Sequence, residues 1–277
     1  MTSVPPTTYL IPVGEADVPR MSTMNSIFDS YSIKWTLTND VFQKTRSLLD
    51  VGCGNGELTI KLAMQLREKG EEVRIVAIDR SDEQIRIARA NSKKLGLTNI
   101  TWIVKDAYRL KELESEHENG FDVVHCRFLL SHLRQPQEVV AQMASLVAKN
   151  GFLIIEELSG HRYQCLPSEP FCMKIWRWAV SIEHFIQGSD LSTGGRLPKI
   201  INNLGMENIE VSQPVPIAAT SEQKALFALS LGGLFKTYMP RLFHFLINPW
   251  ISALQNLEKE PSYSVKFVDF IQIRATK

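Results

Sequence analysis

Three glycines at alternating positions, Gly52, Gly54 and Gly56, form the segment of this sequence best suited to holding a ligand. Glycine lets the backbone approach a ligand closely, and amides at the start of a following helix can donate hydrogen bonds to it. The spacing departs from the dinucleotide fingerprint, because Glu57 occupies the position of its third glycine. Asp50 and Glu57 flank the turn, and acidic neighbours do not favour a phosphate. The turn therefore suits a ligand that carries a positive charge.

Two further carboxylates follow the next two apolar segments. Asp79 ends the segment that begins at Val76, and Asp106 and Ala107 follow the segment that ends at Val104. In open sheets of parallel strands, ligands bind at the carboxyl ends of the strands. Asp79 can accept hydrogen bonds from both hydroxyls of a ribose, and Asp106 with the Ala107 amide would lie at the edge of an adenine. Asp79 alone fits any cofactor that contains adenosine.

Alternating strands and helices are predicted to position these residues. Short apolar segments between turn residues predict strands, whereas apolar residues three or four positions apart predict helices. Asn150 and Gly151 are expected to end the last of these helices. This alternation predicts an α/β fold, in which a doubly wound and mostly parallel sheet has helices on both faces. The predicted strands are 47–51, 73–78, 100–104, 121–125 and 152–156, and the predicted helices are 58–69, 81–95 and 137–148.

The alternation stops after Ser159, and the rest of the chain predicts a helical cap and a return to the sheet. Residues 170–187 predict a cap helix with Phe171, Trp178 and Phe185 on one face, and these aromatic residues, like Trp176 and those of 227–250, are typical of a core. Residues 196–211 predict a helix and a strand, 221–259 predict further helices, and 265–274 predict one last strand. We expect a single domain over 1–277, with an N-terminal arm and helices (1–45), a ligand-binding core (46–159), cap insertions (160–195 and 220–260) and a last strand (265–275). Residues 1–20 contain four prolines and are expected to form an extended arm.

Five motifs in order resemble those of the class I, seven-stranded, S-adenosylmethionine-dependent methyltransferases of the small-molecule type. They are Leu49-Asp-Val-Gly-Cys-Gly-Asn-Gly, Asp79, Asp106-Ala107, Phe121-Asp-Val-Val-His-Cys-Arg-Phe-Leu-Leu-Ser-His-Leu and Asn150-Gly-Phe-Leu-Ile-Ile-Glu-Glu. The resemblance covers about 230 residues from Leu48 onwards. It implies methyl transfer from S-adenosylmethionine, with S-adenosylhomocysteine as the product. This cofactor carries an ammonium and a sulfonium and no phosphate, as the acidic turn requires.

The resemblance also implies roles for individual residues. Gly52 and Gly54 would line the methionine portion, Asp50 would orient its ammonium directly or through water, and Asp79 would hold the ribose. Asp106 would take the adenine amino group, and the Ala107 amide the ring nitrogen. The loop at Cys126 and Arg127 would pass near the sulfonium. The predicted cofactor-binding residues are Asp50, Gly52, Cys53, Gly54, Gly56, Asp79, Arg80, Asp106, Ala107, Cys126 and Arg127.

The acceptor is less well determined than the cofactor. Methyl transfer depends chiefly on the placement of the two reactants, and a general base is needed only for a nucleophile that must lose a proton. The candidates are His132, Glu156 and Glu157, with His161 as a further one, and the sequence does not choose among them. Cap aromatics that line a cavity would predict an apolar or aromatic acceptor. The Asn-Pro-Pro-Tyr signature of enzymes that methylate amino groups of nucleic acids is absent from the sequence, so a small molecule is the expected substrate.

Three alternatives stay open. An NAD-dependent oxidoreductase would share Asp79 but not Glu57, and the sequence has no evident catalytic Tyr-x-x-x-Lys motif. A domain that binds the cofactor without catalysis would carry the same binding motifs. A zinc site at His161, Cys165, Glu169 and Cys172 is disfavoured, because the sequence there has no CxxC pair. The N-terminal residues Tyr9, Glu15 and Arg20 resemble a segment that folds over the cofactor in related enzymes.

Composition narrows the class of protein further. The 277 residues carry 31 basic and 30 acidic side chains, and this balance does not point to a nucleic-acid partner. The four cysteines suggest no disulfide framework, which fits a reducing cytoplasm. We expect neither a signal peptide nor a transmembrane segment, because no stretch approaches the ~20 apolar residues that span a bilayer. A homodimer is compatible with the sequence.

Overall fold

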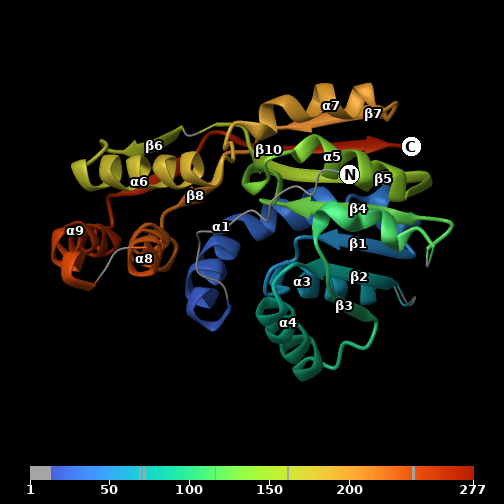
Figure 1. Cartoon of the computed structure of the whole chain (residues 1–277), viewed down its shortest axis with the longest axis horizontal. Helices are drawn as coiled ribbons and strands as arrows, with labels where there is room; N and C mark the ends of the chain where they lie inside the picture. Colours follow the sequence, from blue (N-terminus) through green and yellow to red (C-terminus); the bar gives the residue numbers. More distant parts are fainter. Residues whose placement is uncertain (1–13, 69, 71–72, 116, 161, 239–240) are drawn as a thin grey trace.

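The computed structural model describes residues 14–277 except 69, 71–72, 116, 161 and 239–240, and the side chains of 235–243 are not described. A main sheet of seven strands has the order β3-β2-β1-β4-β5-β10-β7, and a second sheet has the order β6-β9-β8 (Figure 1). The strands are β1 (Ser47–Val51), β2 (Arg74–Asp79), β3 (Ile100–Val104), β4 (Phe121–Arg127), β5 (Val147–Leu158), β6 (Tyr163–Leu166), β7 (Glu207–Ser212), β8 (Ile217–Ala218), β9 (Ser264–Phe267) and β10 (Phe270–Thr276).

Helices connect and cover these strands. The α-helices are α1 (Val18–Thr36), α2 (Asn39–Lys44), α3 (Glu57–Arg67), α4 (Asp82–Lys94), α5 (Pro136–Leu146), α6 (Phe171–Gln187), α7 (Leu197–Asn203), α8 (Ser221–Tyr238) and α9 (Asn248–Glu258). The short 3-10 helices are η1 (Gly14–Asp17), η2 (Ala107–Leu113), η3 (Leu130–His132), η4 (Thr193–Arg196) and η5 (Arg241–Leu246). In the part of the chain that the structure describes, no helix is long and apolar enough to cross a bilayer.

The main sheet is the predicted doubly wound sheet. Strands β1 to β5 are parallel, and β10 runs antiparallel between β5 and β7. Successive side chains of a strand point to opposite faces. Leu48 of β1 accordingly packs with α2, α3 and α4, whereas Leu49 packs with η2, α5 and α7. The two faces of the sheet therefore carry separate hydrophobic clusters, and the site lies at the carboxyl ends of β1 to β4.

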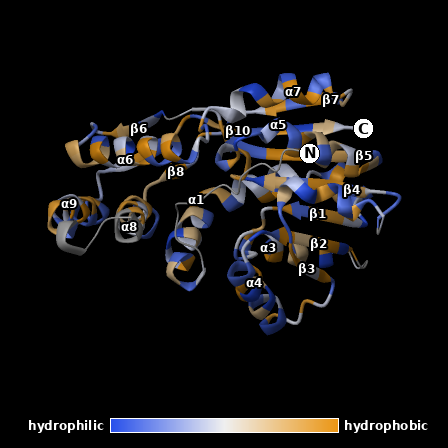
Figure 2. Cartoon of the chain, viewed as in Figure 1, coloured by the Kyte–Doolittle hydropathy of each residue, from blue (hydrophilic) through white to orange (hydrophobic). Residues whose placement is uncertain are grey.

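The cap has its own hydrophobic cluster beside this sheet. Helices α6, α8 and α9 and the small sheet pack with Ile27 and Phe28 of α1, which lies between the cap and the main sheet (Figure 1). Figure 2 shows hydrophobic residues throughout α6, α8 and α9, whereas α4 is mostly hydrophilic. Helix α1 therefore contacts both the cap and the side of the main sheet where β1 to β4 end.

The structure corrects four predictions about the elements. Residues 14–20 begin a helical segment instead of an extended arm, and 1–13 lie outside the described residues. Asn150 does not end a helix, because α5 ends at Leu146 and Asn150 adopts a φ of 62° within β5. The predicted last strand is two strands in different sheets, β9 and β10. The face of α6 that carries Phe171 and Trp178 points outward, with exposed fractions of 61% and 62%.

Candidate active site

A cavity lies where β1 to β4 end, under the first two turns of α1. We call it the strand-end cavity. Its wall includes the predicted residues Gly52, Gly54, Asp79, Arg80, Asp106, Ala107 and Arg127. Asp17, Arg20, Met21 and Met24 of the N-terminal segment cover it. A smaller pocket, which shares Gly52 and Gly54 with it, is lined by Asp50 and Cys53.

The glycine turn uses its amides inside the protein. The amides of Gly52 and Cys53 both donate to the Ile78 carbonyl, at 2.8 and 2.9 Å. The Gly54 amide donates to Oδ2 of Asp79 at 3.0 Å. These amides are therefore not presented to a phosphate, unlike those of a phosphate-binding loop. The turn suits a ligand without phosphate, as its acidic neighbours predicted.

Close packing fixes glycine at the turn. All three residues have φ between 55° and 75°, a region that favours glycine. A Cβ at Gly52 would lie 3.0 Å from the Leu129 side chain, and one at Gly54 would lie 2.5 Å from Met21 Cε. Gly56 differs, because the space beside its Cα is filled by the Trp102 side chain and does not face the cavity. Gly56 immediately precedes α3 and packs against the core, so its place in the fold differs from that of Gly52 and Gly54, which line the cavity.

Gly56→Ala is expected to lower the free energy of unfolding by at least about 2 kcal/mol. An alanine with a left-handed backbone costs about 1–2 kcal/mol, and overpacking adds about 1–3 kcal/mol. The new Cβ would lie 2.5 Å from Trp102 Cη2 and 2.6 Å from Ala88 Cβ. Urea unfolding measures the loss. Gly96→Ala is the matched control, because Gly96 has a φ of 65° and no atom within 4 Å of an added Cβ; equal losses in the two variants would contradict the packing argument.

Two carboxylates line the cavity where the paired strands β2 and β3 end. Asp79 is half-buried and accepts the Gly54 amide on Oδ2 and the Ser81 amide on Oδ1 at 2.8 Å. Burial raises the pKa of Asp79, although both amides oppose the shift. Asp106 is exposed and accepts the Tyr108 amide at 2.9 Å, while its neighbour Ala107 is buried. Each carboxylate is thus fixed by backbone amides and lines the cavity.

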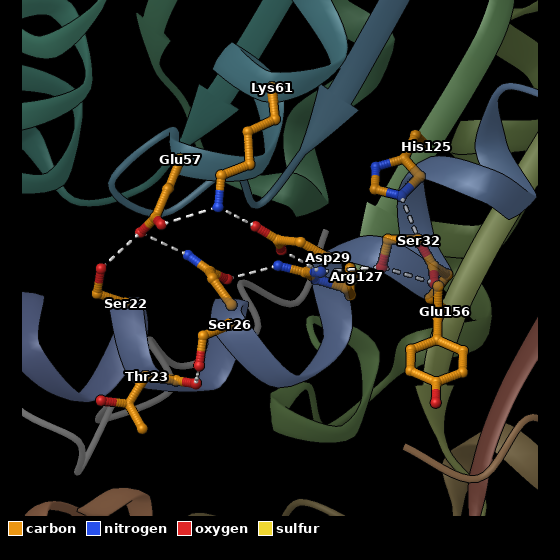
Figure 3. Close-up of polar contacts among 12 residues, drawn as sticks. Ser22, Thr23, Ser26, Asp29, Ser32, Glu57, Lys61, His125, Arg127 and Glu156 are labelled. Atoms are coloured by element: carbon orange, nitrogen blue, oxygen red, sulfur yellow. Dashed lines mark hydrogen bonds and ion pairs between the residues drawn. The ribbon is translucent and has the colours of Figure 1, made fainter. Parts of the chain in front are cut away.

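A buried network of charged groups lies behind the glycine turn. Asp50 is 3% exposed, and its oxygens bind His125 Nδ1 at 2.9 Å and Thr59 Oγ1 at 2.5 Å. His125 Nε2 lies 3.2 Å from Oε1 of Glu156 (Figure 3). Burial lowers the pKa of His125, but the two carboxylates outweigh it and raise this pKa to about 9. His125 is therefore a buried cation at neutral pH, and both Asp50 oxygens already have protein partners.

A second part of the network ties α1 to β4. Arg127 donates to Asp29 at 2.8 Å and to Ser32 at 2.9 Å (Figure 3). It also donates to Asn25 at 2.6 Å. Lys61 of α3 reaches the same Asp29 at 2.5 Å. The Arg127 guanidinium thus lines the strand-end cavity and holds α1 over it.

Besides Gly56, three further predicted site residues line none of the strand-end cavity, the smaller pocket beside it and the cap cavity described below. Glu156 is fully buried and bound by His125, Ser32 and Gln272, and it lines neither cavity. Glu157 is also fully buried and accepts the amides of Ser131 and Leu158, which makes it a structural carboxylate. Cys126 lies inside the hydrophobic cluster of the sheet and lines neither cavity. The residue that reaches the cavity from this strand end is its neighbour Arg127.

A second cavity adjoins the first and enters the cap. We call it the cap cavity, and its walls are mainly apolar, with Phe28, Trp176, Leu226 and Phe267 among them. Arg20, Met24, Phe128 and His132 line both cavities. The predicted candidate His132 therefore lies where the two cavities meet. Its ring stacks on His184 with centroids 5.2 Å apart.

Two polar side chains of the cap cavity, His132 and Glu183, have shifted pKa values. Burial, with help from neighbouring positive charge, lowers the pKa of His132 to about 3. Glu183 of α6 also lines this cavity and is 5% exposed, and burial raises its pKa to about 7. The sequence analysis missed Glu183. The available signal was its position on the α6 face with Trp176 and Ala179, opposite the exposed aromatic face.

Of the remaining sequence-based candidates, some line a cavity and others lie outside both. Among the predicted covering residues, Arg20 lines both cavities, whereas Glu15 forms an exposed ion pair with Arg86. Tyr9 and His161 lie outside the described residues. Of the cap aromatics, Trp176 lines the cap cavity, and Phe185 is 84% exposed.

The fold and the site define a class I S-adenosylmethionine-dependent methyltransferase domain. The main sheet is parallel except for β10, which lies between β5 and β7. An acidic glycine turn follows β1, and a carboxylate lies at the end of β2. These features agree with the order of the motifs in the sequence. A family model described as "Methyltransferase domain" matches residues 42–193, and the chain belongs to this family. S-adenosylmethionine is the cofactor of this class, and the family decides against the NAD-dependent oxidoreductase.

Individual relatives are distant. A ubiquinone biosynthesis O-methyltransferase of Bordetella avium is 30% identical over 158 residues, which are 54% of this chain and 60% of that protein. Its counterpart in Bordetella pertussis is 26% identical, over 66% of this chain and 74% of the relative. This chain thus matches less than two thirds of the first relative's length.

Solved structures share the fold. An O-methyltransferase family protein from Burkholderia thailandensis has a TM-score of 0.56 at 12% identity, covering 95% of this chain and 60% of that one. A phosphoethanolamine N-methyltransferase from Haemonchus contortus in complex with S-adenosyl-L-methionine has a TM-score of 0.53 at 16% identity, covering 95% and 58%. At these identities the likeness concerns the fold alone.

Proposed function

We propose that this protein transfers a methyl group from S-adenosylmethionine to a small apolar or aromatic acceptor. The observation that carries the proposal is the junction of two unlike cavities at Arg20, Met24, Phe128 and His132. The strand-end cavity has carboxylates on its wall, whereas the cap cavity is mainly apolar. A cationic cofactor in the first and an apolar acceptor in the second would meet at this junction.

The residues of the strand-end cavity fit S-adenosylmethionine. When bound, this cofactor supplies a methyl group on a sulfonium, which is already activated for a single displacement. Asp79 would accept the ribose hydroxyls, and Asp106 with Ala107 would face the adenine. Gly52 and Gly54 would allow the methionine portion to lie against the backbone, where a Cβ would meet neighbouring side chains. Asp50 would act on the ammonium chiefly through its charge or a water, because both oxygens are bound to His125 and Thr59.

The apolar cap cavity supports an acceptor that leaves water on binding. Burying apolar surface contributes about 25 cal/mol for each Å² removed from water. Holding the acceptor in line with the methyl group would supply most of the rate enhancement, since proximity and orientation contribute about 7–11 kcal/mol in well-aligned reactions. The relatives named as O-methyltransferases favour an oxygen nucleophile over the other nucleophiles.

Calorimetric titration with S-adenosylmethionine, S-adenosylhomocysteine and NAD tests the cofactor. We expect the first two to bind and NAD not to bind. Transfer of a labelled methyl group to small aromatic hydroxyl compounds then tests catalysis. Cofactor binding without transfer to any acceptor would favour the alternative of a non-catalytic binding domain, and binding of NAD alone would overturn the proposal.

A further inference from the structure

Glu183 is a buried carboxylate with one oxygen left for a ligand. It lies on the inner face of α6, is 5% exposed and lines the cap cavity. Gln187, one turn later on α6, donates its Nε2 to Glu183 Oε1 at 2.8 Å. Within residues 14–277, apart from the gaps given above, Oε2 has no hydrogen-bond partner. Because Glu183 lines the cap cavity, a ligand in that cavity can supply the missing donor to this oxygen.

Among the side chains that the structure describes, none forms an ion pair with Glu183. Arg20 of α1 lies close enough to lower the pKa of Glu183, but its guanidinium is bound to both oxygens of Asp17, each at 2.6 Å. His132 of η3 and His184 of α6 also line this cavity. The lowered pKa of His132 keeps it uncharged at neutral pH. Glu183 is therefore a carboxyl group in the cap cavity that can gain and lose a proton near neutral pH.

We propose that Glu183 is the general base of the methyl transfer and that the acceptor presents a hydroxyl group to its Oε2. This inference rests on the proposed function. The acceptor oxygen forms its bond to the methyl carbon while the carbon–sulfur bond breaks, and sulfur keeps the electron pair of that bond. The hydroxyl proton moves to Glu183 Oε2 and is released to solvent after the product leaves.

The alternatives within the same cavity are less suitable. A general base works best when its pKa lies near the working pH. His132, with a pKa of about 3, is a weak proton acceptor, although its place at the junction suits it to position the acceptor. An ammonium acceptor would stand near Arg20, which lines both cavities, and near the sulfonium. An ammonium would be repelled by the positive charges of Arg20 and the sulfonium, whereas a neutral hydroxyl would not.

Two acceptors that differ in acidity test this role in the full chain. The probes are 2-naphthol and 2-naphthalenethiol, because thiols ionise at lower pH than phenols and need a base less. For the wild type, kcat/KM with 2-naphthol should rise about tenfold per pH unit below about pH 7 and then level off. Glu183→Gln should lower this kcat/KM by about 100-fold to 10,000-fold and remove the rise. The thiol should lose less than about tenfold at pH 9, where it ionises without help.

Controls separate a catalytic from a structural role. Glu183→Gln should leave the S-adenosylmethionine Kd unchanged, because Glu183 does not line the strand-end cavity. Glu169→Gln removes another cap carboxylate, which pairs with Arg177 at 2.5 Å outside both cavities, and should leave the pH profile unchanged. An unchanged rate and pH profile in Glu183→Gln, or an equal loss with both acceptors, would overturn this inference and leave the proposed function standing. If the wild type binds the cofactor and methylates neither probe nor any other aromatic hydroxyl compound, both fail.

Discussion

Asp79→Ala is expected to weaken the binding of S-adenosylmethionine by about 100-fold or more. Hydrogen bonds to charged groups are worth about 1.5–3 kcal/mol each, and about 1.4 kcal/mol corresponds to a tenfold change in affinity. The carboxylate is set in place by the Gly54 and Ser81 amides, so its remaining lone pairs can receive both ribose hydroxyls. Calorimetric titration gives the Kd of the variant and of the wild type.

Two companion variants sharpen this test. Asp79→Asn keeps one acceptor oxygen and should lose about tenfold in affinity, which corresponds to one charged hydrogen bond. Asp82→Ala is the matched control, because Asp82 is exposed on α4 three residues further on and does not line the cavity. Thermal unfolding of each variant shows whether it is folded. Wild-type affinity in a folded Asp79→Ala would show that the ribose is not held here.

His125→Leu is expected to lower the free energy of unfolding by about 3–5 kcal/mol. Removing one partner of a buried ion pair leaves an uncompensated buried charge, at a cost of that size. His125 is fully buried between Asp50 and Glu156, so leucine would leave two carboxylates without their cation. Urea unfolding measures the loss. Adding Glu156→Gln to this variant should recover part of the stability, and a further loss would contradict the electrostatic explanation.

The same cation should make stability depend on pH. The pKa of His125 is about 9 in the folded protein and near 6.5 when unfolded. The folded state therefore binds the proton more tightly, and its contribution is complete below about pH 6.5 and is lost as pH rises through about 9. The difference between the two pKa values corresponds to about 3 kcal/mol. The stability gap between the wild type and His125→Leu should narrow over this pH range, and a gap that widens would contradict this sign.

The sequence was most informative where local pattern and burial agree. Strand 100–104 was predicted with the bounds it has in the structure, and the strand before the glycine turn likewise matches β1. Strand β1 is buried on both faces, and turn residues bound the apolar segment of β3. Both apolar segments were therefore predicted as strands. The alternation of strands and helices also predicted that the strands run parallel, because helices that connect neighbouring strands by right-handed crossovers produce parallel strands.

The cap was less predictable because its inner face is not uniformly apolar. Helix α6 buries Glu183, His184 and Gln187 beside a cavity and exposes Trp178 and Phe185. Hydrophobic periodicity predicts that the most apolar face of a helix is buried. In α6 the face with the large aromatic residues Trp178 and Phe185 is instead exposed. Glu183 was missed for the same reason. The small sheet of β6, β8 and β9 was missed because its strands are two to four residues long and pair only across long sequence distances.

At the cofactor side, residue type was predicted better than residue environment. The carboxylates Asp79 and Asp106 line the cavity as expected. The sequence could not show that His125 would take one oxygen of Asp50, because residues 75 positions apart meet only through the pairing of β1 with β4. The pairing of β4 with β5 likewise brought the catalytic candidate Glu156 to His125, where it is a partner of the buried imidazole.

The position of β10 has a consequence for the growing chain on the ribosome. Strand β7 joins the main sheet only through β10, and the two are separated in sequence by the segment that carries α8 and α9. Translation at about 5–20 residues per second puts an interval on the order of several seconds between these strands. During that interval β7 has no strand partner, and the edge of β5 that β10 will cover is open to chaperones. The sheet is therefore completed late, after the cap helices have emerged.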